Sequence, residues 1–272
     1  GRVWVHLETD LGREAEAGKL FVRTFLGARD PVLGNLPQEW HGDVRLQGVD
    51  LDKVGEWFGI KGRELSVDFT GNYSGGAAVP VHASGVVTLR NGNFAGSKLE
   101  MAKIRIHDIR LGTEENEDSI WTSPSSFELF FENIEKRLVS LIFAGTIEEV
   151  RGSLGRRRVP LRFFSGDLQI EGGDLTATRL EGVYGRGVHV NSLDVHWPSI
   201  FSSNGIEVEV ELAAVTQVSD SFYDLTGWSS NEEIDQLKDY IEIVSGKARL
   251  TLIGRFDTRK YENSVYQAKV EW

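Results

Sequence analysis

One stretch of the sequence alternates without interruption between apolar and acidic residues. Four apolar residues are interleaved with three glutamates in the order Ile206, Glu207, Val208, Glu209, Val210, Glu211 and Leu212. Successive side chains of a β-strand point to opposite faces, so a strand here has one apolar and one acidic face. Antiparallel sheets with one face in water show this alternation, whereas parallel sheets covered on both faces give continuous apolar runs. The stretch therefore predicts an antiparallel sheet.

The same alternation recurs along the chain. It is present in the segments Val44–Leu46, Leu65–Phe69, Phe127–Phe131, Leu168–Ile170 and Leu250–Leu252. The 272 residues include 30 Gly but only 6 Pro and 1 Met, a balance that favours many short strands joined by tight turns. We therefore expect an all-β protein with a few short helices.

Two short helices are expected between the strands. Ser230–Glu233 forms a capping box, and apolar residues at helical spacing follow it, so a helix is predicted near 231–244 with Gly246 as its stop. A second helix, of about two turns, is predicted near 50–58, because apolar residues lie on one face between Asp50 and Gly59.

Internal repetition is the second strong signal. Ser84–Phe94 aligns without gaps on Ser165–Leu175, and a third copy of the opening starts at Ser245. Asn91-Gly92 and Gly172-Gly173 occupy positions where a two-residue primed turn needs positive φ. Hairpin repeats are therefore predicted near 84–96, 165–177 and 245–254, within one continuous segment over 1–272. The alternative is chance recurrence in a glycine-rich all-β chain.

Charge and cysteine content exclude several classes of protein. The formal net charge is −11 and the sequence pI is about 5.1, so no nucleic-acid partner is expected. The chain contains no Cys, which removes disulfides, thiolate metal sites and thiol nucleophiles. The sequence starts with Gly1 and leads directly into a strand-like segment, so we interpret it as an internal part of a longer chain.

The sequence contains no recognisable catalytic motif. No Walker loop, Gly-x-Ser-x-Gly elbow or His-Glu-x-x-His pattern occurs, so neither a cofactor nor a metal is expected and the protein is interpreted as non-enzymatic. His189 and His196 would lie on opposite faces of a strand unless a bulge intervenes. A hydrolase with an unrecognised pair of carboxylates is the alternative.

Two further groups of side chains are candidates for binding. Arg156, Arg157 and Arg158 are weak candidates for contact with anionic head groups, although a surface hairpin explains them as well. Aromatic residues that could form a platform for stacking sugars are Trp40, Trp57, Trp121, Trp197 and Trp228. These tryptophans share no common strand spacing, which favours a structural role for each.

Three segments together resemble the AsmA-like proteins of Gram-negative bacteria. The resemblance lies in Gly48–Val54, Gly62–Gly71 and Ala83–Gly96, in which a short helix precedes a glycine-led amphipathic strand and a hairpin follows. The stretch from Val215 through Gly254 looks like a further copy, so the resemblance covers most of the chain. The pattern is one of spacing and residue type and contains no invariant catalytic motif.

The resemblance implies a periplasmic protein, anchored in the inner membrane through parts outside this sequence. Its long antiparallel sheet would be twisted and curled into a groove that carries phospholipid between the inner and outer membranes. Membrane contact through those outside parts and unknown envelope partners are implied as well.

Physical chemistry agrees with that role, because moving an acyl chain through water costs about 0.8 kcal/mol per CH₂, or about 10 kcal/mol and more per chain. An apolar track lowers this cost. The residues expected to line it are Leu65, Val67, Phe69, Leu168, Ile170, Ile206, Val208, Val210, Leu212, Leu250 and Leu252. The alternative is a carbohydrate- or protein-binding β-sandwich or adhesin-like module, in which the same residues pack as ordinary core.

Overall fold

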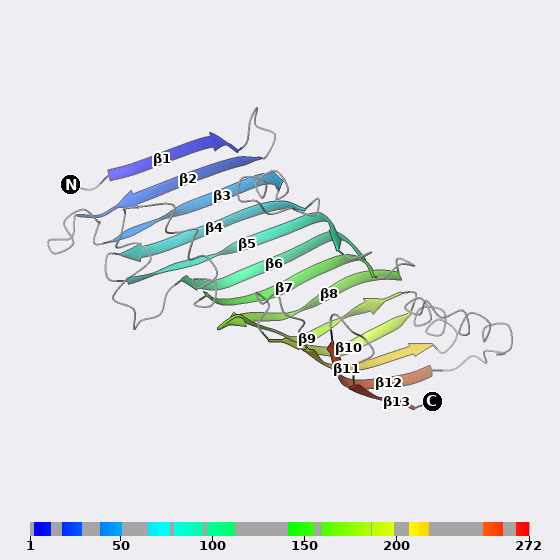
Figure 1. The fold of residues 1–272 in the computed structure, drawn as a ribbon. Helices are drawn as coiled ribbons and strands as arrows, with labels where there is room; N and C mark the ends of the chain where they lie inside the picture. The colour runs from blue at the N-terminus through cyan, green and yellow to red at the C-terminus, as the bar shows by residue number, and fades with distance from the viewer. Residues whose placement is uncertain are drawn as a thin grey trace.

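The alternating segments that the structure describes form strands of one antiparallel β-sheet (Figure 1). The structure is a computed structural model. It describes residues 3–11, 18–28, 39–50, 65–76, 79–94, 97–111, 141–154, 159–185, 187–198, 207–217, 247–257 and 265–271. Nearly all of these residues lie in strands, so the all-β prediction is confirmed.

The described residues contribute thirteen strands to the sheet. Their bounds are β1 Val3–Asp10, β2 Lys19–Leu26, β3 Trp40–Asp50, β4 Ser66–Gly76, β5 Val79–Phe94, β6 Ser97–Leu111, β7 Leu141–Leu154, β8 Val159–Glu171, β9 Asp174–Tyr184, β10 Val188–Trp197, β11 Glu207–Gln217, β12 Lys247–Asp257 and β13 Val265–Glu271.

Each strand pairs with the strands that precede and follow it in the sequence, from β1 at one edge to β13 at the other. Every pairing is antiparallel. The sheet is therefore a meander, the topology that successive hairpins produce. This confirms the prediction of an antiparallel sheet built from repeated hairpins.

The two hairpin turns predicted in the repeat have different outcomes. Gly172 and Gly173 connect β8 to β9 with φ of +61° and +87°, as a primed turn requires. The turn predicted at Asn91-Gly92 is wrong, because Phe94 pairs with Ser97 and the chain reverses only after Phe94. Asn91 does adopt a φ of +61°, but the pairing of β5 with β6 continues past it without a shift in register. The unusual dihedral is accommodated inside the strand.

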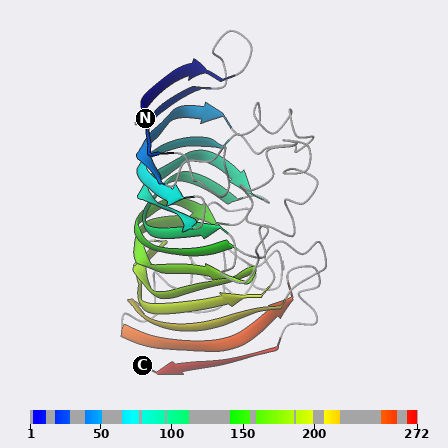
Figure 2. The same ribbon diagram turned by 90° about the vertical axis from the view of Figure 1, so that its left-hand side faces the viewer.

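The sheet is curved across its width, and the strands bend along their length (Figure 2). Register shifts interrupt the pairing at several places, including β3 after Leu46, β8 after Arg162 and β10 after Val190. An extra residue in one strand bends it and increases its right-handed twist. These irregularities contribute to the curl of the sheet, which is consistent with the curled sheet that the resemblance implied.

The two predicted helices lie outside the described residues, except that Asp50 is the last residue of β3. The predicted strand Phe127–Phe131 lies outside them as well. Among the described residues, no helix is long and apolar enough to cross a membrane.

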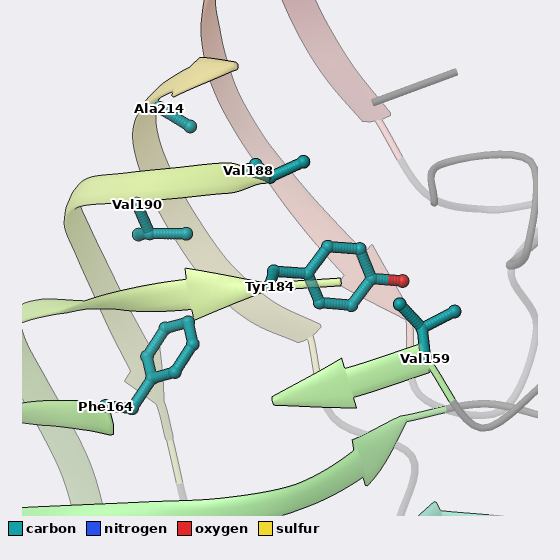
Figure 3. Packing of buried hydrophobic residues seen from close by; sticks show 6 residues of the cluster. All are labelled: Val159, Phe164, Tyr184, Val188, Val190 and Ala214. Carbon is teal, nitrogen blue, oxygen red and sulfur yellow. The ribbon is translucent and has the colours of Figure 1, made fainter. Parts of the chain in front are cut away.

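The most deeply buried side chains gather on one side of the curved sheet. Six of them, from β8 to β11, form a cluster of Val159, Phe164, Tyr184, Val188, Val190 and Ala214 (Figure 3). The curl brings these side chains from four neighbouring strands against one another. The cluster is therefore the local core of the sheet.

Candidate functional site: the apolar face

A row of directly paired residues crosses the sheet from one edge to the other. It takes one residue from each strand, in the order Leu7, Val22, Val44, Gly71, Gly85, Ile106, Gly145, Leu168, Ala177, Val195, Val210, Gly254 and Tyr266. We call this set the central row. With twelve steps of about 4.8 Å between neighbouring strands, it extends over about 58 Å.

The central row contains only apolar residues and glycine, apart from the hydroxyl of Tyr266. Directly paired residues share a face of the sheet, so all of these positions lie on one side. A second row beside it is also largely apolar and joins Leu20, Leu46, Phe69, Val87, Ile104 and Ile147. We call this side of the sheet the apolar face.

The opposite side, called here the polar face, is covered by ion pairs. Lys103 Nζ and Arg105 both contact the carboxylate of Glu148, the former at 2.7 Å. Arg255 Nε lies 3.0 Å from Glu209 Oε1, which joins β12 to β11. Further pairs on this face are Arg23–Asp43, Arg90–Asp68, Arg151–Glu149 and Arg179–Asp167. Arg151 and Glu149 both belong to β7, whereas the other pairs join neighbouring strands and so support the strand register.

The ion pairs shift the pKa of carboxyl groups on the polar face, among them Glu148 and Asp108. Hydrogen bonds from Lys103, and then from Arg105, lower the pKa of Glu148 below its usual range and outweigh the opposing effect of burial. Burial alone would raise the pKa of Asp108, but hydrogen bonds from Arg110 and His82 outweigh it and lower the pKa. Both carboxylates are therefore held in the charged form.

The strand register places most of the expected lining residues on the apolar face. The following residues lie on the apolar face, because they belong to the two rows or pair directly with residues of the same face: Val67, Phe69, Leu168, Ile170, Val210, Leu250 and Leu252. Val208 and Leu212 alternate along the backbone of β11 in phase with Val210. Leu65 precedes β4 directly, whereas Ile206 and the arginines Arg156, Arg157 and Arg158 lie outside the described residues.

The predicted lining residues whose exposure is described are half-buried, and none belongs to the fully buried core. Towards the edges of the sheet the apolar face opens to solvent, with Leu7 50% exposed in β1 and Val270 50% exposed in β13. Side chains that fill the interior of a sandwich are normally buried at crystal-like density. The apolar face thus keeps hydrocarbon surface near its edges that a ligand could cover, whereas Ile106 and Ala177 of the central row are buried.

The structure also shows a feature that the sequence pattern missed. His189 and His196 both lie on the polar face, because the register of β10 shifts between Val190 and Ser192. No periodicity reveals this bulge. Across the described part of the chain, no group of three or more His, Asp or Glu side chains is arranged to hold a metal ion.

Comparison with known protein families, with curated proteins and with solved structures found no match for this chain. Function is therefore inferred from the geometry of the two faces.

Proposed function

We propose that this chain is a non-enzymatic segment of a bridge-like lipid transfer protein, along which phospholipid acyl chains move on the apolar face. The central row carries the proposal, because it is an uninterrupted apolar path about 58 Å long. An acyl chain on this path avoids the cost of about 0.8 kcal/mol for each CH₂ that water would otherwise contact. No chemical step is needed.

The composition of the path suits movement of a ligand better than tight retention. The four glycines of the central row, Gly71, Gly85, Gly145 and Gly254, contribute no side chain of their own at these steps. No charged residue interrupts the row, so no ion pair or buried charge holds an acyl chain at one strand.

The location in the cell is part of the same proposal. The resemblance to AsmA-like proteins supports a periplasmic position between inner and outer membranes, with an inner-membrane anchor in the full-length protein. The β-sandwich alternative requires a second sheet over the apolar face. The described strands form one sheet and do not supply it.

A photo-crosslinking experiment tests the proposal with a matched control. A photoreactive phenylalanine analogue is placed at Leu168, on the apolar face, or at its neighbour Gln169, which pairs with Thr176 on the polar face. Each purified chain is illuminated with phospholipid vesicles, and the adducts are identified by mass spectrometry. Lipid adducts at 168 and none at 169 support the proposal. Equal labelling at both positions contradicts the proposal. Absence of labelling at both positions, together with absence of co-purified lipid, contradicts it as well.

A further inference from the structure

The polar face carries a hollow near the first edge of the sheet that the lipid proposal does not use. Its volume is about 440 Å³, within the range usual for small-molecule sites. Strands β1 to β6 contribute its lining, which includes Trp4, Asp43, Asn72, Ser84, His82 and Asp108. Most of these residues occupy the side of the sheet opposite the central row.

An exposed aromatic cluster forms one wall of this pocket. Trp4 is 53% exposed. Its ring meets Phe25 edge-on at 5.3 Å between centroids and His41 at 6.0 Å, while Phe25 and His41 stack at 4.7 Å. The guanidinium of Arg23 lies 5.6 Å from the centroid of Trp4. These contacts hold the indole in place at the rim although it is largely open to water.

Polar side chains in the pocket have hydrogen-bonding capacity that the described residues leave unused. The side chains of Asn72, Ser74 and Ser84 make no hydrogen bond within the described part of the chain. An amide and two hydroxyls offer donors and acceptors side by side. A ligand with several hydroxyl groups satisfies such a set.

The charges of the pocket cancel locally. Arg23 pairs with Asp43, and Asp108 receives a hydrogen bond from Arg110 Nε at 2.6 Å and contacts His82 Nδ1 at 3.1 Å. No excess of positive charge among these described residues therefore favours an anion such as phosphate. A second hollow of about 690 Å³ lies on the same face near β9 to β13, but its described lining contains no tryptophan.

We propose that the pocket bounded by Trp4, Asn72 and Asp108 binds a short neutral oligosaccharide. The apolar C–H face of a sugar ring packs on the exposed indole, while its hydroxyl groups bond to the amide, hydroxyl and imidazole groups of the wall. Trp4 was not among the tryptophans that the sequence suggested as a platform for stacking sugars. The pocket and the central row lie on opposite faces, so this inference is independent of the lipid proposal.

Saccharide binding at this pocket is tested by calorimetry and saturation-transfer NMR on the full 272-residue chain, with maltotriose, cellotriose and chitotriose as probes. At least one probe is expected to bind with a Kd of about 1 mM or below, and Trp4→Ala is expected to weaken it about tenfold. Trp197→Ala removes a partly exposed tryptophan from the apolar face and serves as the control, with unchanged affinity.

Asn72→Ala is a second variant, which keeps the aromatic wall of the pocket intact. If Trp4→Ala alters the circular dichroism spectrum, and with it the fold of the sheet, the affinity of Asn72→Ala tests the proposed saccharide site instead. Asn72→Ala is expected to weaken binding several-fold. The inference is overturned if none of the three saccharides binds, if binding is unchanged in both pocket variants, or if inorganic phosphate displaces the saccharide.

Discussion

Gly71 of β4 and Gly85 of β5 face each other directly in the central row. A Cβ atom placed on Gly85 would lie 2.6 Å from the Cα of Gly71, and one placed on Gly71 would collide with the carbonyl oxygen of Ser84. The two backbones thus approach more closely than any side chain at these positions permits. A side chain at either position would therefore push β4 and β5 apart on the apolar face.

Substitution at this contact should destabilise the sheet. Gly85→Val forces a branched side chain against the backbone of β4, and we expect the free energy of unfolding to fall by about 1–3 kcal/mol. Urea denaturation followed by circular dichroism measures the change. Ser84→Ala, at the neighbouring polar-face position, should change the free energy by no more than about 0.5 kcal/mol. Equal midpoints for Gly85→Val and the wild type would rule out the close approach.

A charge on the apolar face should block lipid binding without unfolding the chain. In Val210→Asp a carboxylate enters the central row, where contact with hydrocarbon costs it several kcal/mol, so co-purified lipid should be lost. Mass spectrometry of extracted lipid measures this. Thr251→Asp, on the polar face of β12, is the matched control and should retain lipid. Unfolding of Val210→Asp would instead indicate a closed core at this position.

The ion pairs around Glu148 should make stability depend on pH in the acid range. Because the pKa of Glu148 is lower in the folded state, its contribution to stability is complete above the ordinary glutamate value of about 4.5. That contribution is lost as the pH falls through the folded pKa. Glu148→Gln should therefore reduce the acid-dependent fall in the free energy of unfolding, as measured by urea titrations below neutral pH. A pH profile of Glu148→Gln equal to that of the wild type would refute the assignment.

The turn between β8 and β9 should tolerate only certain residues. Gly172 has a φ of +61°, and a Cβ atom added to it would meet open space, so backbone conformation alone restricts the position. Gly172→Val should lower the free energy of unfolding by about 1–2 kcal/mol, whereas Gly172→Asn should be nearly neutral, because asparagine adopts this region more readily. Thermal unfolding compares the two. Similar melting temperatures would contradict a strained turn.

The hairpin predicted at Asn91-Gly92 shows how local sequence misleads. The dipeptide has the composition of a primed turn, and Asn91 adopts the positive φ expected of one. Cross-strand pairing nevertheless continues to Phe94, since the register of β5 with β6 holds without a shift up to Ser97. Long-range hydrogen bonding therefore outweighed the local turn signal. The sequence alone offers no measure of that competition.

Trp4 illustrates what sequence reasoning could not find in the candidate pocket. It stands near the start of the chain, 37 residues from His41 and further still from Asp108, and no spacing links them. Stacking of successive hairpins brings them to one wall. Only the pairing of β1 through β6 creates this neighbourhood.

By itself the sequence determined which side chains share a face within each unbroken stretch of strand, because the two-residue period of an extended chain depends on local geometry alone. It also determined that the sheet is antiparallel, through the contrast between apolar and charged positions such as Val210 and Glu209. The tertiary structure decided how the strands are offset. Register depends on hydrogen bonds between residues far apart in the chain and on bulges such as the one after Val190, and it is register that joins separate apolar stripes into one row from Leu7 to Tyr266.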